Sequence, residues 1–267
     1  MIPLRDHNPT QRPPVLTVIV ILICIAVFVL VQPDASRSLD MPTQAETIED
    51  IEFSYQRAAI PCELTQGRPL TAREIGATQI DGNANACDHS AAGSAVFPDK
   101  NVWLAVVVSM FLHGSWLHLG GNILFLWIFG NNVEDQMGRA VYALFYLIAG
   151  VVATASYVVV QVDSTVPLIG ASGAIAGVMG AYLVWYPWAR VRTIVLLGLL
   201  PLWPRLPAAL LLAVWFVSQF FIAPDSGVAW MAHVAGFLFG VLAGLIARGD
   251  RQFARSLATQ RRRALGR

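Results

Sequence analysis

Charged residues are scarce in this sequence of 267 residues, of which they make up 13%. Soluble domains contain about 25% charged residues. Hydrophobic residues make up 56% of the chain, and the mean hydropathy is +0.58. This balance excludes a protein that is soluble along its whole length, and it predicts a lipid bilayer as the surroundings of much of the chain.

Two further kinds of feature are missing. The dense basic run is the tail "RRRALGR", which contains no aromatic residue, so the sequence predicts no nucleic-acid partner. The chain has three cysteines, and no Cys/His spacing is typical of a zinc site. We therefore expect no metal ion and no cofactor.

Long apolar segments predict the fold. The first, 15–32, contains 18 uncharged residues, about enough to cross a ~30 Å hydrocarbon core and longer than the apolar region of a signal peptide. Five more follow at 115–130, 140–160, 171–187, 206–222 and 228–247. The apolar stretch 193–205 is interrupted by "PLWPRLP", so we expect it at the membrane interface. The predicted fold is an all-α, polytopic bundle of six transmembrane helices.

Arginine is distributed unevenly between the segments that connect these helices. With six spans, 13 arginines lie on one side, in the N-terminus, the 131–139 turn, the 188–205 connection and the tail. The short loops near Asp163 and Asp225, on the other side, contain no Lys or Arg. The positive-inside rule then predicts a cell-membrane protein with both termini in the cytoplasm. The predicted segments are a cytoplasmic N-terminus (1–14), a first span (15–32), an external loop (33–101), a core of five spans (102–248) and a basic cytoplasmic tail (249–267).

The predicted external loop 33–101 differs in composition from the spans, with eleven Asp or Glu residues and no long apolar run. It contains Cys62 and Cys87. Outside the cytoplasm a disulfide between them is expected, and two free thiols are the alternative in a reducing compartment.

A serine lies among small residues in "GASGAIAG" (170–177). A hydroxyl in a membrane helix usually packs against a neighbouring helix, so Ser172 alone indicates packing. A second unusual residue changes this interpretation: His233, in "MAHVAGFLFGVLAG", is ionisable and lies within the last span, where such residues are usually functional.

Glycines would allow these two helices to meet. Gly236 and Gly240 form a row close to His233, and Gly173 and Gly177 offer a matching face next to the serine. Packing of glycine on glycine would bring Ser172 and His233 within hydrogen-bonding distance, which is the pairing of nucleophile and general base that activates a serine.

The segment "HGSWLHLGGNILF" adds His113, His118 and Asn122. His118 and Asn122 are four residues apart and share one face of a helix. A metal site is an alternative for this group, but no third ligand stands at a suitable spacing. Their N–H groups suit a developing oxyanion, together with the backbone N–H of Ser172. We expect His113 to brace the loop.

The order H-x4-H-x3-N, G-x-S-G and A-H-x2-G-x3-G over 101–248 resembles the rhomboid intramembrane serine proteases, and "MIPLRDHNPT" is similar to many bacterial members. The resemblance implies a dyad of Ser172 and His233 without a third acid, with His118 and Asn122 as oxyanion donors. We also expect Gly170, Gly173, Gly236 and Gly240 to support the site structurally. The implied reaction is cleavage of single-span transmembrane proteins near the outer membrane surface.

A segment and a single residue near these motifs are interpreted separately. "GNNVEDQMGR" (130–139) resembles a structural turn of the family, so Glu134 and Asp135 are expected to have no chemical role. Many members have a tyrosine four residues after the serine, below the histidine, where this chain has Ala176.

Two other functions compete with proteolysis. A catalytically inactive rhomboid-like protein would bind membrane clients without cleaving them, but such proteins typically lack the serine or the histidine. A transporter would have charges at the midplane of the membrane, and the predicted spans have no Asp, Glu, Lys or Arg at their centres.

Overall fold

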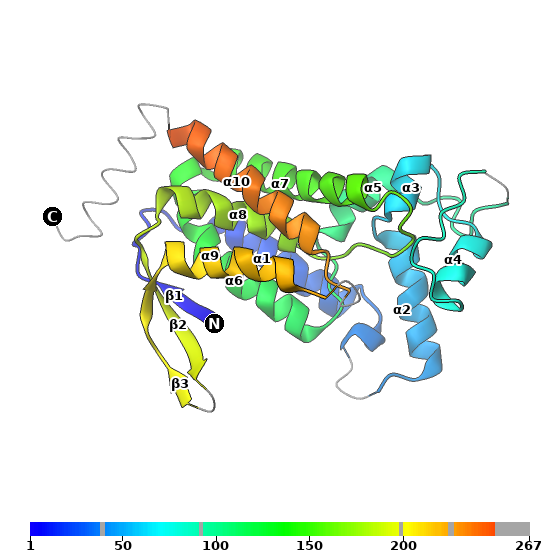
Figure 1. The fold of residues 1–267 in the computed structure, drawn as a ribbon, viewed down its shortest axis with the longest axis horizontal. Helices are drawn as coiled ribbons and strands as arrows, with labels where there is room; N and C mark the ends of the chain where they lie inside the picture. The colour runs from blue at the N-terminus through cyan, green and yellow to red at the C-terminus, as the bar shows by residue number, and fades with distance from the viewer. Residues whose placement is uncertain (38–40, 91–92, 198–199, 224–226, 249–267) are drawn as a thin grey trace. The chain divides into compact units, whose positions relative to one another are not determined.

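The structure of the chain is a computed structural model that describes residues 1–37, 41–90, 93–197, 200–223 and 227–248 (Figure 1). The chain divides into two compact units. The first consists of Met1–Leu22, Gly120–Ala153 and Ser172–Arg267, and the second of Ile23–Leu119 and Thr154–Ala171. The predicted basic tail 249–267 lies outside the described residues.

Each of the six predicted apolar segments forms a helix. The helices are α1 (Val15–Leu30), α6 (Trp116–Met137), α7 (Arg139–Val160), α8 (Ser172–Trp185), α9 (Ala208–Ser218) and α10 (Trp230–Arg248). A short 3-10 helix, η2 (Gln219–Phe221), continues α9. By length and composition, two of the described helices, α7 and α10, could cross a membrane, and α1, α8 and α9 with η2 are shorter apolar helices.

The predicted turn over 131–139 was wrong in its extent, because α6 continues to Met137. The chain reverses at Gly138, which has a φ of +77°, a conformation that glycine adopts without steric cost. The helix α7 begins at the next residue, Arg139.

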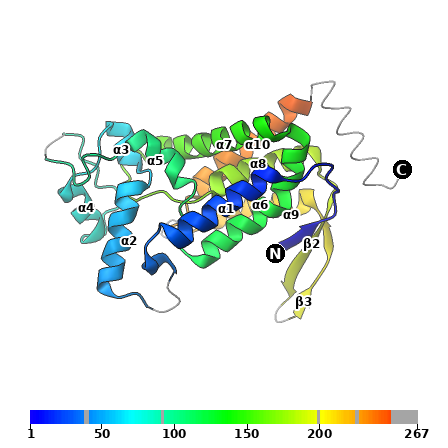
Figure 2. The ribbon, with the colours of Figure 1, turned by 180° about the vertical axis from the view of Figure 1, so that it is seen from behind.

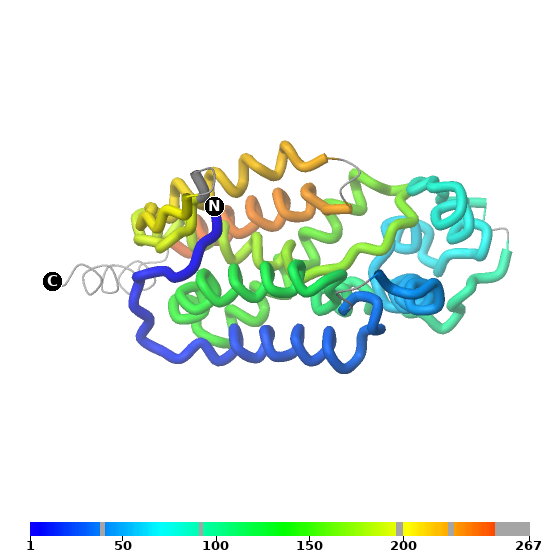
Figure 3. Tube along the Cα trace, turned by 90° about the horizontal axis from the view of Figure 1, so that it is seen from below, coloured from blue at the N-terminus to red at the C-terminus, as the bar shows by residue number. Residues whose placement is uncertain are grey.

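In the first unit, α8 is the most deeply buried helix. Its residues from Ala174 to Tyr182 are all buried, and Trp185 donates its indole N–H to the Gly244 carbonyl of α10 at 2.9 Å. The helices α8 and α10 lie side by side (Figure 1), and α9 lies beside α10 (Figure 3). The core of this unit therefore forms around α8.

The prediction of an all-α fold was incomplete, because the first unit also contains a four-stranded sheet. The strand β2 (Arg190–Leu197) pairs antiparallel with β1 (Ile2–Asp6), β3 (Leu200–Leu202) and β4 (Arg205–Pro207). Figure 2 shows β1 next to β2. Buried and exposed side chains alternate along β2, as is typical of a strand: Val191 and Thr193 are buried, whereas Arg190 and Arg192 are exposed. The stretch 193–205, expected at the interface, contributes to these strands.

In the second unit, the segment predicted as a long loop contains helices. They are η1 (Asp34–Arg37), α2 (Gln44–Arg57), α3 (Pro61–Gln66) and α4 (Ala72–Gln79), and α5 (Val102–Ser109) follows. Both α2 and α4 begin with a capping box, in "TQAE" and "TARE", whose threonine and glutamate satisfy the first N–H groups of the helix. Tyr55, Ile60, Cys62 and Leu70 form a buried cluster, against which Ile51 of α2 and Ile75 of α4 pack. The expected disulfide between Cys62 and Cys87 is present in this unit.

Candidate active site

Ser172 and His233 lie in direct contact in the first unit. Ser172 is the first residue of α8, and His233 lies in the first turn of α10. The distance from Oγ of Ser172 to Nε2 of His233 is 2.7 Å, which is a good hydrogen bond. A serine hydroxyl bonded to an imidazole nitrogen is the arrangement in which the imidazole can remove the hydroxyl proton.

Glycines bring the two helices close enough for this contact. A Cβ atom at Gly236 would overlap the carbonyl oxygen of Gly173, and one at Gly240 would overlap the carbonyl oxygen of Gly177. A Cβ at Gly173 would be 2.6 Å from the Cβ of Ala153 in α7. The backbones of α8 and α10 thus meet directly, with small residues of α7 behind them.

His233 has a second polar partner that the sequence did not identify. Its Nδ1 is 2.8 Å from Oε1 of Gln219, which is buried at the start of η2. The Trp215 ring of α9 is also close, with a centroid distance of 6.0 Å to the imidazole. The available signal was an amide within the largely apolar segment 206–222, a rare position for a polar side chain.

Asn122 lies in the same unit as Ser172 and His233. Its side chain is 9% exposed, and its Nδ2 has no hydrogen-bond partner within the described residues. A buried amide N–H without a partner costs free energy, and such groups call for a functional or structural reason. An N–H donor kept in this state is suited to receive an oxyanion.

His118 and His113 lie in the second unit, with their rings in edge contact at 5.2 Å. The Gly114 N–H donates to Nδ1 of His118 at 3.4 Å, so a neutral His118 has its own proton on Nε2 and can act there as a donor. The backbone of His113 is held at both polar groups by the Gln32 amide, at 2.9 and 2.7 Å. Burial, with a smaller contribution from His118, lowers the pKa of His113 to about 4. His113 is therefore a neutral residue fixed in a loop.

Gly170 sets the path of the chain just before the serine. It has a φ of +123°, which side chains rarely adopt, and its N–H donates to the Ser109 carbonyl at 2.9 Å within the second unit. The Oγ of Ser109 accepts the Ala59 N–H at 2.6 Å. The segment that leads into α8 is thereby tied to the end of α5.

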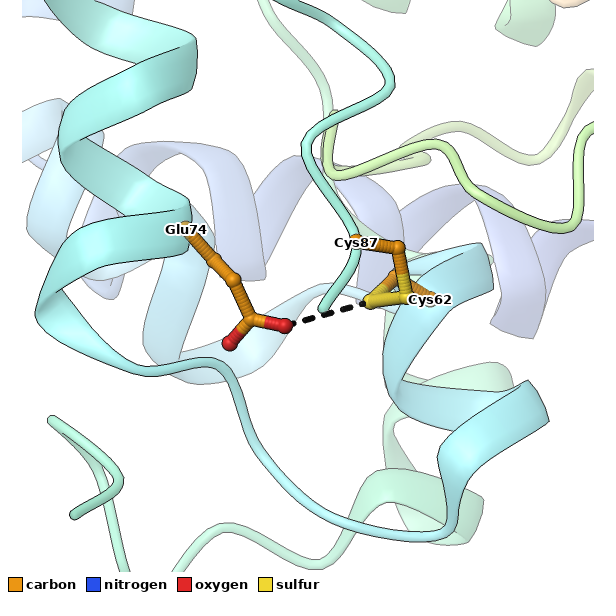
Figure 4. A group of neighbouring side chains, drawn as sticks. All are labelled: Cys62, Glu74 and Cys87. Carbon is orange, nitrogen blue, oxygen red and sulfur yellow. Dashed lines mark hydrogen bonds between the residues drawn. A yellow bond between two sulfur atoms is a disulfide. The ribbon is translucent and has the colours of Figure 1, made fainter. Parts of the chain in front are cut away.

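Two groups of potential metal ligands occur in the described part of the second unit, and both contain Cys87. One joins it with Cys62 and Glu74, and the other with His89 and Asp163. Figure 4 shows the disulfide, with Oε1 of Glu74 at 3.7 Å from the Cys62 sulfur. A disulfide sulfur has no proton to donate and is no thiolate ligand, so neither group can hold a metal while the bond is intact.

Comparison with known proteins identifies the family. The family described as Rhomboid domain matches residues 100–249, more than half of the chain. Rhomboid-like protein 11, chloroplastic, from Arabidopsis thaliana is 33% identical over 36% of this chain and 35% of its own length. Rhomboid protein 1, mitochondrial, from Saccharomyces cerevisiae is 29% identical over 53% of this chain and 41% of its own length.

A mammalian relative gives a similar match. Presenilin-associated rhomboid-like protein, mitochondrial, from Bos taurus is 32% identical over 51% of this chain and 36% of its own length. The match thus spans less than half the length of each of these three relatives. The match to the Rhomboid domain covers α6 to α10, which include Ser172, His233 and Asn122. The chain therefore belongs to the rhomboid family and has its helical, polytopic membrane fold.

Proposed function

We propose that this chain is an intramembrane serine endopeptidase that cleaves single-span transmembrane proteins. The observation that carries the proposal is the 2.7 Å contact between Oγ of Ser172 and Nε2 of His233. Serine hydroxyls are weak nucleophiles unless a neighbouring base takes their proton, and His233 is the base that lies within reach.

The proposed reaction has two halves. Oγ of Ser172 attacks the scissile carbonyl carbon while its proton passes to Nε2 of His233. The peptide C–N bond then breaks, the amine leaves with that proton, and an acyl-enzyme ester remains on Ser172. In the second half, His233 takes a proton from a water molecule as that water attacks the ester carbonyl. The C–O bond to Ser172 then breaks, His233 returns the proton to Oγ of Ser172, and the new carboxyl group leaves.

The negative charge on the carbonyl oxygen needs donors during both halves. We assign this role to Nδ2 of Asn122, the His118 ring and the backbone N–H of Ser172. The unpartnered, buried Nδ2 of Asn122 supports the assignment. The position of Ser172 as the first residue of α8 supports it too. The first N–H groups of a helix have no acceptor within the helix and can stabilise a negative charge.

The proposed topology has six spans and both termini in the cytoplasm of a cell, with the segment 33–101 outside. The arginine distribution supports this orientation. His118, Ser172 and His233 each lie in the first turn of α6, α8 or α10, helices that would start on the same side of the membrane. The site would then open near the outer surface, where the water needed for hydrolysis is available.

The test is cleavage of a generic single-span substrate by the purified protein in detergent. Wild type should release two fragments, and Ser172→Ala and His233→Ala should release none. Ser156→Ala, a half-buried serine on α7, is the matched control and should cleave as wild type does. Equal cleavage by wild type and Ser172→Ala would reject the proposal. A wild type that binds the substrate and never cleaves it would favour the inactive, client-binding alternative.

A further inference from the structure

We infer that Gln219 is a positioning residue for His233. In this inference the amide carbonyl of Gln219 holds the imidazole in the tautomer that is protonated at Nδ1, and this tautomer leaves Nε2 free to take the proton of Ser172. The role in catalysis rests on the proposed function, whereas the tautomer itself can be observed without any activity.

The orientation of the Gln219 amide follows from its other contacts. Its Nε2 lies 3.0 Å from the backbone carbonyl of Trp215 and 3.4 Å from Oγ of Ser218. A backbone carbonyl can only accept, so the NH₂ end of the amide must face it. The oxygen Oε1 consequently points the other way, toward Nδ1 of His233 at 2.8 Å.

The tautomer of His233 follows from the amide. Because an amide oxygen only accepts hydrogen bonds, Nδ1 of His233 must carry the proton in this contact. A neutral imidazole has one N–H, so Nε2 has a lone pair, and this lone pair faces Oγ of Ser172 at 2.7 Å. The series of hydrogen bonds that joins Trp215, Gln219, His233 and Ser172 therefore fixes the direction of proton transfer, from Oγ of Ser172 to Nε2 of His233.

The surroundings make Gln219 hard to replace. Its side chain is 4% exposed, so water cannot easily take the place of its carbonyl. The backbone carbonyl of Trp215 accepts a hydrogen bond from the Gln219 amide. The Trp215 ring also lies near the imidazole of His233, with 6.0 Å between the ring centroids.

A neutral partner also has a chemical consequence. An amide orients the imidazole without adding charge, whereas a carboxylate at the same place would also stabilise the imidazolium. The elements that carry Ser172, Trp215 and Gln219, which are α8, α9 and η2, contain no Asp, Glu, Lys or Arg. On α10 itself, the basic residue Arg248 is at the far end of the helix. A Gln219→Glu substitution would place a carboxylate at Nδ1 of His233, where wild type has a neutral amide oxygen.

The first test is ¹⁵N NMR of protein with labelled histidine, with the His233 signals assigned through His233→Ala. In wild type at high pH, the neutral ring should show a protonated Nδ1 and an unprotonated Nε2. In Gln219→Leu this preference should be lost. A wild-type His233 protonated at Nε2, or an unchanged tautomer in Gln219→Leu, would overturn the inference.

The second test is kinetic. Gln219→Leu should lower kcat by about tenfold or more, short of the 10²–10⁴-fold that general-base catalysis contributes as a whole, with KM and thermal stability little changed. Gln219→Glu should retain activity, with the acid limb of its pH profile of kcat/KM moved to higher pH. Phe221→Leu, at an exposed neighbour, is the matched control with wild-type kinetics.

The outcomes separate this inference from the proposed function. If cleavage depends on Ser172 but Gln219→Leu keeps the wild-type kcat, or Gln219→Glu keeps the wild-type pH profile, the positioning role is wrong. If wild type and Ser172→Ala do not differ in cleavage, the protease function is wrong, and the NMR result alone decides the tautomer.

Discussion

The carboxylate of Glu134 accepts two hydrogen bonds from Thr17, one from the backbone N–H and one from the hydroxyl, each 2.8 Å long. The Leu16 N–H donates a third at 2.9 Å. Because α1 begins at Val15, both N–H groups belong to the first turn, whose donors have no carbonyl partner within the helix. Glu134, from α6, thereby caps the start of α1 with a negative charge at the positive end of its dipole.

Removal of this cap should destabilise the protein. Glu134→Ala leaves the buried N–H of Thr17 and the half-buried N–H of Leu16 without this acceptor, and we expect a loss of about 2–4 kcal/mol in the free energy of unfolding. Glu134→Gln, which keeps one acceptor oxygen, should lose less. Thermal unfolding in detergent measures both. Equal stability of wild type and Glu134→Ala would contradict the capping role.

The Asp6 carboxylate of β1 predicts a pH dependence. It is buried and accepts hydrogen bonds from Tyr182 at 2.5 Å and from Asn132 at 2.8 Å. Burial outweighs the hydrogen bonds from Tyr182 and the Asn8 N–H and raises the pKa of Asp6 from 3.8 to about 6. The folded state therefore binds the proton more tightly than the unfolded state does. The stability that this proton provides is present below about pH 4 and is lost as the pH rises through about 6.

Substitution of Asp6 tests this sign. The pKa change corresponds to at most about 3 kcal/mol, so the free energy of unfolding of wild type should fall between about pH 4 and pH 6 relative to Asp6→Asn. Unfolding in detergent at a series of pH values measures the difference between the two proteins. A difference that stays constant with pH, or that grows in favour of wild type as the pH rises, would contradict the assignment.

The backbones of α10 and α8 meet directly at Gly240 and Gly177, so we expect a single methyl group added at Gly240 to affect stability and activity. Gly240→Ala should cost about 1–3 kcal/mol of stability through overpacking and should reduce activity, because separating α8 from α10 moves His233 away from Ser172. Gly76→Ala in α4 is the matched control, since a Cβ there meets no atom within 4 Å. Unfolding and cleavage assays compare the two. A tolerated Gly240→Ala would refute the close packing.

The role of Asn122 as an oxyanion donor predicts a rate effect without a folding effect. Asn122→Ala should lower kcat by about 10²- to 10³-fold, less than the loss in Ser172→Ala, because other donors remain. Its KM and thermal stability should change little, since Nδ2 has no partner in the described structure whose bond would be broken. Single-turnover cleavage measures the effect. Full activity would remove Asn122 from the site.

The positions of the apolar helices could be predicted because long uncharged segments leave few alternatives in a membrane protein. Their ends were harder to predict. The polar residues of "GNNVEDQM" suggested a turn, yet Glu134 and Asp135 find their partners in the N-terminal segment and allow α6 to continue. Such contacts join residues more than 100 positions apart, and no local pattern shows them.

The second unit and the sheet were missed for different reasons. The capping boxes at Thr43 and Thr71 were visible as S/T-x-x-E patterns, and they could have predicted α2 and α4. The local sequence of β1 gives no strong signal for a strand. Its pairing partner β2 lies far along the sequence, so the pairing is visible only in the tertiary structure.

The candidate site was predictable where the residues are rare for their surroundings. An ionisable His233 in an apolar span, with glycines at helical spacing, indicated a close contact with the serine helix. Gln219 is one polar residue at the end of an apolar helix, and only the tertiary structure joins it to His233.

The central claim, that His233 activates Ser172 as a nucleophile, is tested most directly by a fluorophosphonate, which bonds covalently to an activated serine. Mass mapping of the labelled protein should find one adduct, on Ser172, in wild type. The adduct should be absent in Ser172→Ala and nearly absent in His233→Ala, because the two residues act as one unit. A wild type that stays unlabelled at Ser172, or that labels equally after His233→Ala, would contradict the account.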